Sequence, residues 1–432
     1  MTKQSKIKNL ISKFLQLHNR KIDLNLDRVN RLNKDLRIDI NKLQKKTITV
    51  SGTNAKASIA AIIRSIFESA GYKVDLFTSP HCQSYTERFI FESKEISEAS
   101  LFNLLLEVGK KNDSKPITIF ELLTSAFYYY SASKSKSDVL IAEHGLFRRY
   151  DAVASIGHHL SNVCCVCSLD HLEWLPEGKK NIDQIIFEKT SDIKSSNIVV
   201  AEQSNNKILN KIKQNIKNNP AKKVIFSENY SYEINPGGFL YKDEYGSIQL
   251  PKPNLLGSHQ ISNAACAIAT IRNLKKYKIK NEHIIKGMTS INLRGRLEII
   301  NKGYLKQLAP SNTIICDIAS NPNAATAISK YLNALDKNKK IFMICGMLNN
   351  KIIDKTLKNF RQVSEVLAID IPNNNNCIKK ENLKKIIEKI GIKSKTSNSI
   401  QEAIKYIANK DKNSIILILG SIYLFGEVLN LN

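Results

Sequence analysis

The stretch Thr47–Ser58, TITVSGTNAKAS, constrains the fold of this chain more than any other. Ile48 and Val50 alternate with polar residues, which predicts a short strand. Gly52 then opens a tight turn, and the apolar spacing of the next residues predicts a helix that ends at Gly71. A strand, a glycine turn, a lysine and a hydroxyl at the start of a helix make up the layout of a phosphate-binding loop.

The match to such a loop is incomplete, because a Walker loop has a glycine before the lysine and this chain has Ala55. If the loop does bind phosphate, backbone N–H groups and the helix N-terminus face the anion. Lys56 then adds a positive charge, and the Ser58 hydroxyl can hold Mg²⁺. The alternative is an ordinary strand–turn–helix unit that happens to carry a lysine. The loop alone leaves both open, so the flanking sequence has to decide.

Length and charge narrow the class of protein. A chain of 432 residues predicts two or three domains. Its net charge of +26 would suit nucleic acid, an anionic membrane or acidic substrates. The lysines are scattered among asparagines and isoleucines, however, with no basic block and no basic motif interleaved with aromatic residues. We therefore expect no nucleic-acid partner and no membrane partner, while a field that attracts acidic small molecules remains compatible.

The cysteines and the chain ends indicate a cytoplasmic protein. None of the eight cysteines forms a CxxC pair, so neither a zinc site nor a disulfide framework is predicted, and buried reduced thiols are expected. No apolar run has transmembrane length, and the N-terminus has no signal-peptide core. The apolar spacing of Ile7–Leu15 predicts an amphipathic helix packed on the domain.

Strands and helices alternate along the first part of the chain. This order implies a mostly parallel sheet, whose ligands gather at the carboxyl ends of the strands, where Ser58, Glu143 and His171 lie. A small antiparallel insert is expected near 227–251. The strands predicted from the pattern are 72–78, 138–143, 162–168 and 197–201, and the helices are 99–110, 120–132, 182–192 and 262–274.

A second set of alternating elements follows a change of composition near Leu293–Glu298. Its predicted strands are 313–317, 340–345, 366–370 and 414–419, and its helices begin near Ala324, Ile352, Glu381 and Ile400. We therefore expect two domains, 1–296 and 297–432, the second of them Rossmann-like but without a glycine-rich dinucleotide motif.

Short sequence motifs that can be compared with those of known families occur in both expected domains. They are GTNAKAS at 52–58, TSPH at 78–81 with Glu87-Arg88, FELLT at 120–124, EHGLFRRYDAVA at 143–154, SLDH at 168–171, EKTSD at 188–192, GSHQISNA at 257–264, GRLE at 295–298, DIASNP at 317–322 and GSIYLFGEV at 420–428. From about Leu24 to the C-terminus, the chain resembles the folylpolyglutamate synthase/dihydrofolate synthase family of the Mur ligase superfamily.

The resemblance implies an α/β protein with an N-terminal P-loop ATPase-type domain, a mostly parallel sheet and a C-terminal Rossmann-like domain. It implies a ligase that uses ATP to activate a carboxylate of dihydropteroate or a folate as an acyl phosphate, which the amine of L-glutamate then attacks. The implied cofactors are ATP and two Mg²⁺ ions, with K⁺ as a further candidate. We expect a monomer.

The resemblance also assigns roles to individual residues. For ATP binding these are Gly52, Thr53, Asn54, Ala55, Lys56, Ala57, Ser58, Asn263, Arg296 and Asp317. For catalysis they are Lys56, Glu143, His171 and Lys189; for the metals, Ser58, Ser79, Glu143, His171 and a carbamylated Lys189; and for the folate, His81, Arg88 and Asp151. His81 and Asp151 have a structural role as their alternative. Closure of two rigid lobes joined near Leu293–Glu298 is expected to place ATP between Asn263, Arg296 and Asp317.

Departures from the family pattern keep other functions open. Ala55 and Ala57 replace loop glycines, Phe147 and Arg148 replace a Gly-Gly pair, and Ile318 and Ser320 replace Gly and His. Arg148 or Arg149 could compensate at the phosphate loop if the neighbouring loop swings in. Besides an active folate–glutamate ligase, the alternatives are a ligase for another acid or amino acid and a non-catalytic protein that binds folate or nucleotide.

Overall fold

The strand that leads into the glycine turn, β1 (Thr47–Ser51), lies inside an eight-stranded sheet of order β4-β3-β2-β5-β1-β6-β7-β8. It pairs in parallel with β5 on one side and β6 on the other, and all its residues are buried. Two of its pairs, β2 with β3 and β3 with β4, are antiparallel. The remaining strands are β2 (Val74–Phe77), β3 (Phe89–Phe91), β4 (Lys94–Glu95), β5 (Val139–Glu143), β6 (His159–Cys164), β7 (Ser195–Val200) and β8 (Lys222–Ile225).

This computed structural model describes residues 3–20, 22–336 and 338–432. The chain forms two units. The first contains Met1–Cys167, Asn181–Asn254 and Ile261–Asn292, and the second contains Ser168–Lys180, Leu255–Gln260 and Leu293–Asn432. Two short segments that precede the predicted boundary at residue 297 therefore belong to the second unit.

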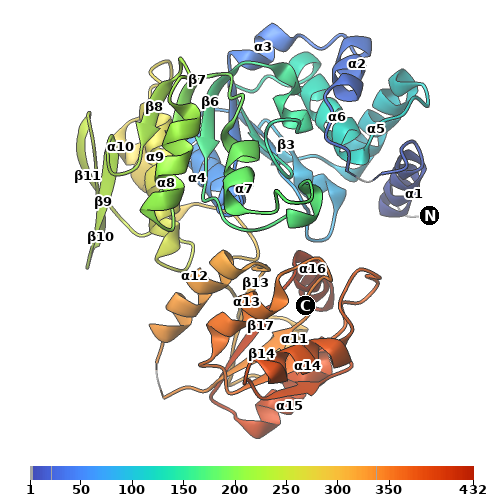
Figure 1. The fold of residues 1–432 in the computed structure, drawn as a ribbon, viewed down its shortest axis with the longest axis vertical. Coiled ribbons are helices and arrows are strands. Elements are labelled where there is room, and N and C mark those ends of the chain that lie inside the picture. Colours follow the sequence, from blue (N-terminus) through green and yellow to red (C-terminus); the bar gives the residue numbers. More distant parts are fainter. Residues whose placement is uncertain (1–2, 21, 337) are drawn as a thin grey trace. The chain divides into compact units, whose positions relative to one another are not determined.

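Helices cover both faces of the large sheet (Figure 1). Connections between parallel strands are right-handed, and the chain moves across the sheet in opposite directions after β1 and after β6. The helix that follows β1 therefore lies on the opposite face from the two that follow β6 and β7. The helices are α1 (Lys3–Leu15), α2 (Asp27–Asp35), α3 (Ile40–Gln44), α4 (Lys56–Ser69), α5 (Glu98–Asn112), α6 (Ile119–Ser133), α7 (Ile182–Thr190), α8 (Asn206–Ile216), α9 (His259–Arg272) and α10 (Asn281–Thr289).

A three-stranded antiparallel sheet follows β8. Its strands are β9 (Tyr230–Asn235), β10 (Gly238–Asp243) and β11 (Gly246–Leu250), with β10 in the middle. This is the insert expected near 227–251.

The second unit is built on a six-stranded sheet of order β12-β13-β17-β14-β15-β16 (Figure 1). All its pairs are parallel except that of β12 with β13. Its elements are β12 (Glu298–Ile300), α11 (Tyr304–Leu308), β13 (Thr313–Asp317), α12 (Pro322–Asn333), β14 (Ile341–Cys345), α13 (Ile353–Leu357), β15 (Glu365–Ala368), α14 (Lys380–Lys389), β16 (Ser394–Thr396), α15 (Ile400–Lys410), β17 (Ile415–Leu419) and α16 (Ile422–Leu431). The α/β architecture with two parallel sheets is as the sequence predicted.

Most predicted elements are confirmed within a few residues, but one strand was placed wrongly. The strand predicted at 162–168 is β6, which spans His159–Cys164. His159, Ser161 and Asn162 are polar although they are buried, so the apolar pattern gave no sign of where the strand begins. The N-terminal helix is confirmed, since Ile7, Ile11 and Phe14 are buried in the core beside α5 and α6. All eight cysteines are free thiols, and all except Cys82 are buried.

Within the described residues, no helix combines the length and the apolar character needed to cross a bilayer.

Candidate functional site

Gly52 forms the turn between β1 and α4. Its φ is +139°, and a Cβ at this position would lie 2.7 Å from the Cβ of Cys165. Both the backbone conformation and the close approach exclude a side chain, so the turn requires glycine.

Part of the loop is hydrogen-bonded within the protein. The N–H groups of Thr53 and Asn54 donate to the Val166 carbonyl at 2.8 and 3.1 Å. The N–H groups available to an anion are therefore those of the first turn of α4, because a helix leaves these without intrahelical partners. This narrows the expected phosphate site to the start of the helix, where Ser58 is buried.

The two alanines that replace loop glycines differ in conformation. Ala55 precedes α4 with φ +72° and ψ −12°, in the left-handed region. Ala57 lies inside α4 and has no positive φ. Of the two alanines, only Ala55 therefore has the backbone strain that a left-handed conformation imposes on an alanine.

Lys56 and Glu143 meet at the carboxyl ends of β1 and β5. Lys56 Nζ lies 3.8 Å from Glu143 Oε1, and it donates to the carbonyls of Gly52 and Thr53 at 3.2 and 3.4 Å. The backbone N–H of Ser79, which follows β2, donates to Glu143 Oε2 at 3.4 Å. The ammonium and the N–H group offset part of the cost of burying this carboxylate.

Lys189 connects the glycine turn to the loop that follows Glu143. Its side chain is buried at the end of α7, and Nζ donates to the carbonyls of Gly52 at 3.0 Å and Leu146 at 2.6 Å. As an ammonium, Lys189 holds two backbone segments together. It fits the role of a metal ligand only after carbamylation, because an ammonium has no lone pair for a cation.

Asp151 holds the loop 144–151 in shape. Its Oδ2 accepts the N–H groups of Gly145 and Leu146 at 2.9 and 3.2 Å, and its Oδ1 accepts that of Val153 at 3.0 Å. His144 Nδ1 lies 3.2 Å from Asp151 Oδ1, and burial lowers the pKa of His144. These contacts support the structural alternative for Asp151.

Arg148 and Arg149 contact α7 and the residues just past its end, so compensation for the missing glycines by either arginine would require the loop 144–151 to move. Arg148 is buried and donates to the carbonyls of Ser191 and Asp192, just past the end of α7, at 3.2 and 2.5 Å. Arg149 forms a bidentate pair with Glu188 at 2.8 and 3.0 Å. Both arginines therefore attach the loop to α7.

His81 and Arg88 lie together in the connection between β2 and β3. Arg88 Nε donates to His81 Nδ1 at 2.8 Å, and the rings of His81 and Tyr85 are 4.3 Å apart. Burial and the neighbouring guanidinium lower the pKa of His81 to about 3, so the imidazole is neutral. Of the residues assigned to the folate, these two are in direct contact.

In the second unit, Asp317 ends β13. Its carboxylate accepts the N–H groups of Leu297 at 2.8 Å and Ala319 at 2.7 Å. Burial raises the pKa of Asp317, and the charge of Arg296 counteracts the shift. Arg296 Nη1 also donates to the Gly295 carbonyl at 3.1 Å. The third expected nucleotide contact, Asn263, is buried on α9 of the first unit.

His171 lies beside an ion pair of the second unit that the sequence analysis missed. The Asp170 carboxylate accepts Lys351 Nζ at 2.9 Å and Asn321 Nδ2 at 3.3 Å. His171 has φ +60°, and its Nε2 lies 3.8 Å from Asp170 Oδ2. The motifs SLDH and DIASNP contain three of these residues, but their spacing in sequence gives no sign of the contacts.

The first unit thus brings together the glycine turn, Lys56, Ser79, Glu143 and Lys189. Among the described residues, no group of three or more His, Cys, Asp and Glu side chains is arranged to hold a metal. Any metal here would therefore need hydroxyl, phosphate or carbamate oxygens besides Glu143. Glu143 is buried and contacts Lys56, the first residue of α4, and Ser58 is buried in the same helical turn as Lys56. Carboxylate and hydroxyl oxygens are ligands of the kind that Mg²⁺ prefers.

Known proteins resemble this chain along its whole length. Residues 295–422 match the model of the Mur ligase, glutamate ligase domain. The dihydrofolate synthase/folylpolyglutamate synthase of Escherichia coli is 28% identical over 83% of this chain and 80% of its own length. That of Bacillus subtilis is 26% identical over 88% of each chain. The structure of E. coli FolC in complex with DHPP and ADP matches with a TM-score of 0.86 and 26% identity, covering 100% of this chain and 98% of that one.

A P-loop unit on a mostly parallel sheet, followed by a glutamate ligase domain on a second parallel sheet, defines a protein of the Mur ligase class. Within that class, the relatives that this chain resembles along its length are dihydrofolate synthase/folylpolyglutamate synthases.

Proposed function

We propose that this protein is an ATP-dependent ligase that joins L-glutamate to dihydropteroate, to a reduced folate, or to both. The observation that carries the proposal is the convergence of the glycine turn, Lys56 and Glu143 at the carboxyl ends of β1 and β5. The match to the E. coli enzyme over 83% of the chain supplies the substrate class.

The chemistry requires activation of a carboxylate, which is a poor electrophile. A carboxylate oxygen of the acceptor attacks the γ-phosphorus of ATP, ADP leaves, and an acyl phosphate forms. The glutamate amine then attacks the acyl carbon, phosphate leaves, and the nitrogen loses a proton to give the amide. Positive charge must offset the negative charge that develops on the transferred phosphoryl group.

The residues of the first unit supply that charge. Lys56 Nζ, now bonded to two loop carbonyls, would turn to the β- and γ-phosphates when ATP enters. The N–H groups of the first turn of α4 would receive the phosphate oxygens. Asn263, Arg296 and Asp317, the other residues expected to contact ATP, would hold the rest of the nucleotide. Domain closure would keep water from the acyl phosphate.

Two divalent ions are part of the proposal. Ser58 and Glu143 would hold one, and His171 and a carbamylated Lys189 would complete the other, with Ser79 as a further oxygen donor. Bound Mg²⁺ would neutralise charge on the phosphates. Removal of divalent ions with a chelator should abolish phosphate release, and Mg²⁺ should restore it.

Carbamylation of Lys189 has a direct test. In ¹³C-bicarbonate, the active enzyme should give a carbamate carbonyl signal that is absent in Lys189→Ala. That variant should lose most turnover, and short carboxylic acids should restore part of it. Lys46→Ala is a matched control, because Lys46 is also buried and donates to the carbonyl and hydroxyl of Ser137. An active wild-type enzyme without the signal would leave Lys189 as a connector of backbone segments only.

The acceptor can be identified by phosphate release with L-glutamate and a panel of pterins. Release with dihydropteroate alone would indicate a dihydrofolate synthase, and release with tetrahydrofolate as well would indicate a bifunctional enzyme. No release with any acceptor, under conditions where a pterin still binds, would favour the non-catalytic alternative. The left-handed Ala55 is the observation behind that alternative.

The setting of the reaction is also part of the proposal. The eight free thiols support a reducing compartment such as the cytoplasm. A monomer is expected, and size-exclusion chromatography with light scattering would test it.

A further inference from the structure

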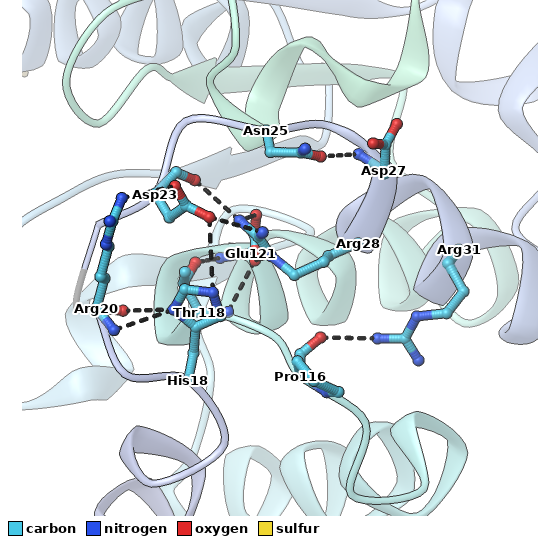
Figure 2. Close-up of polar contacts among 10 residues, drawn as sticks. All are labelled: His18, Arg20, Asp23, Asn25, Asp27, Arg28, Arg31, Pro116, Thr118 and Glu121. Carbon is cyan, nitrogen blue, oxygen red and sulfur yellow. Dashed lines mark hydrogen bonds and ion pairs between the residues drawn. The ribbon is translucent and has the colours of Figure 1, made fainter.

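The start of α6 is tied to the N-terminal segment by an ion-pair network (Figure 2). Arg28 on α2 forms a bidentate pair with Glu121, with Nε–Oε2 at 3.1 Å and Nη2–Oε1 at 2.8 Å. The same guanidinium donates to Asp23, at 2.8 Å to its carboxylate and 3.0 Å to its carbonyl. Charge-assisted bidentate pairs of this kind fix orientation as well as distance.

Glu121 also caps the N-terminus of α6. Its Oε2 accepts the N–H of Thr118 at 2.7 Å, and the Thr118 hydroxyl accepts the N–H of Glu121, which completes a capping box at the start of α6. The carboxylate is therefore shared between the cap of α6 and Arg28. Because only 4% of the Glu121 side chain and 18% of Arg28 are exposed, the pair is shielded from solvent screening.

Further contacts of α2 reinforce this arrangement. Arg31, one turn after Arg28, donates to Asn112 Oδ1 at 2.8 Å and to the Pro116 carbonyl at 3.3 Å, the second contact being visible in Figure 2. Asn33 bridges Ser125 on α6 and Ser155 of the turn that follows Asp151. The helix α2 thus holds the α5–α6 connection, α6 and the 3₁₀ helix Ala152–Ile156 that follows the loop 144–151.

Phe120, the residue before Glu121, links the start of α6 to the candidate site through its contact with Gly145. Phe120 lies so close to Gly145 that a Cβ on the glycine would be 2.7 Å from the ring. Gly145 is the second residue after Glu143, and its N–H is held by Asp151. The position of the Phe120 ring therefore limits where the backbone of the loop 144–151 can lie.

We propose that Arg28 and Glu121 are positioning residues for the acceptor half of the site. They fix the start of α6, hence Phe120, and hence the loop between Glu143 and Asp151. The proposal rests on the proposed ligase function, and it assigns neither residue a contact with substrate. Of the residues assigned to the folate, His81 and Arg88 lie in the connection between β2 and β3, and Asp151 holds the loop 144–151 itself, whereas the glycine turn follows β1.

Glu121→Gln tests the proposal, because it keeps the shape of the side chain and an oxygen for the cap while removing the charge. The KM of the acceptor should rise roughly tenfold or more, since small displacements of a binding site have large effects. The KM of ATP should change less than about twofold. Arg28→Lys, which keeps the charge but loses the planar fork, should give a smaller effect in the same direction.

Asp243→Asn is the matched control. The Asp243–Arg272 pair is also bidentate, at 2.8 and 3.0 Å, with 3% and 13% of the side chains exposed. Asp243 likewise accepts a nearby backbone N–H, that of Tyr245. This variant should lower thermal stability as Glu121→Gln does and leave the KM of the acceptor unchanged.

Hydrogen exchange separates this inference from the proposed function. Exchange in 144–151 should be faster in Glu121→Gln and unchanged in Asp243→Asn, whether or not the wild-type protein turns over. Absence of wild-type turnover would overturn the ligase proposal by itself. Unchanged exchange in 144–151, or an equal rise of both KM values, would overturn the positioning role.

Discussion

Ala55 carries the strain of the candidate site at the scale of single residues. It occupies the left-handed region where the family has glycine, and this conformation costs an alanine about 1–2 kcal/mol. Strain of this kind persists only where the surroundings fix the backbone. Here the fixed points are Gly52, which admits no side chain, and Thr53 and Asn54, whose N–H groups are held by Val166.

The two alanines should respond in opposite ways to replacement by glycine. Ala55→Gly should raise the free energy of unfolding by about 1 kcal/mol and tighten ATP binding, because it removes the strained Cβ. Ala57→Gly should lower stability by about 0.5–1 kcal/mol, because Ala57 lies within α4, and should leave ATP binding unimproved. Urea unfolding and ATP titration of both variants would measure this. Tighter ATP binding from Ala57→Gly alone would contradict the conformations described.

At the scale of elements, α7 is joined to the loop 144–151 at three points. Lys189 donates to Leu146, Arg149 pairs with Glu188, and Arg148 donates to the carbonyls past the end of the helix. Burial lowers the pKa of Arg148 to about 10, so its guanidinium is still charged at neutral pH. Arg148, which stands where the family pattern has glycine, is therefore a buried hydrogen-bond donor to the carbonyls at the C-terminal end of α7.

Arg148→Met should destabilise the first unit by about 1–3 kcal/mol, because it leaves two carbonyls without their charged donor. Arg149→Met should cost about 1 kcal/mol or less, since that ion pair is partly exposed. Calorimetry of the two variants would compare them. Equal stabilities of Arg148→Met and the wild type would show that the cost of burying the guanidinium cancels its hydrogen bonds.

At the scale of the whole molecule, buried histidines make stability depend on pH. Burial lowers the pKa of His81 and His159 to about 3 and that of His259 to about 4, and it also lowers the pKa of His144. The unfolded chain then binds protons that the folded chain does not. Stability from these groups is therefore complete above about pH 6.5 and falls as the pH decreases toward the folded-state values.

From pH 7 to pH 5, His159 alone should remove about 2 kcal/mol of unfolding free energy. Three of the four histidines lie in the first unit, so its transition should shift more than that of the second unit. Urea unfolding at pH 7, 6 and 5 would show this. His159→Gln should flatten the pH dependence, and an unchanged slope in that variant would mean that folding does not shift the pKa of His159.

The sequence by itself determined the order of elements, the glycine turn and the resemblance to dihydrofolate synthase/folylpolyglutamate synthases. Strands and helices follow from local apolar periodicity, and Gly52 and Gly71 end their elements through backbone freedom that the chain carries locally. The sequence pattern did not predict where β6 begins, because His159, Ser161 and Asn162 are polar and give no apolar signal although they are buried.

Only the tertiary structure decided what the charged residues of the site contact. Lys189 bonds carbonyls 137 and 43 residues away in sequence, and Arg28 pairs with Glu121 across 93 residues. Such pairs form because a buried charge must find partners among whatever backbone and side chains the packing brings near it. A local pattern records that a lysine or arginine is present, whereas its partner is set by the three-dimensional arrangement of distant elements.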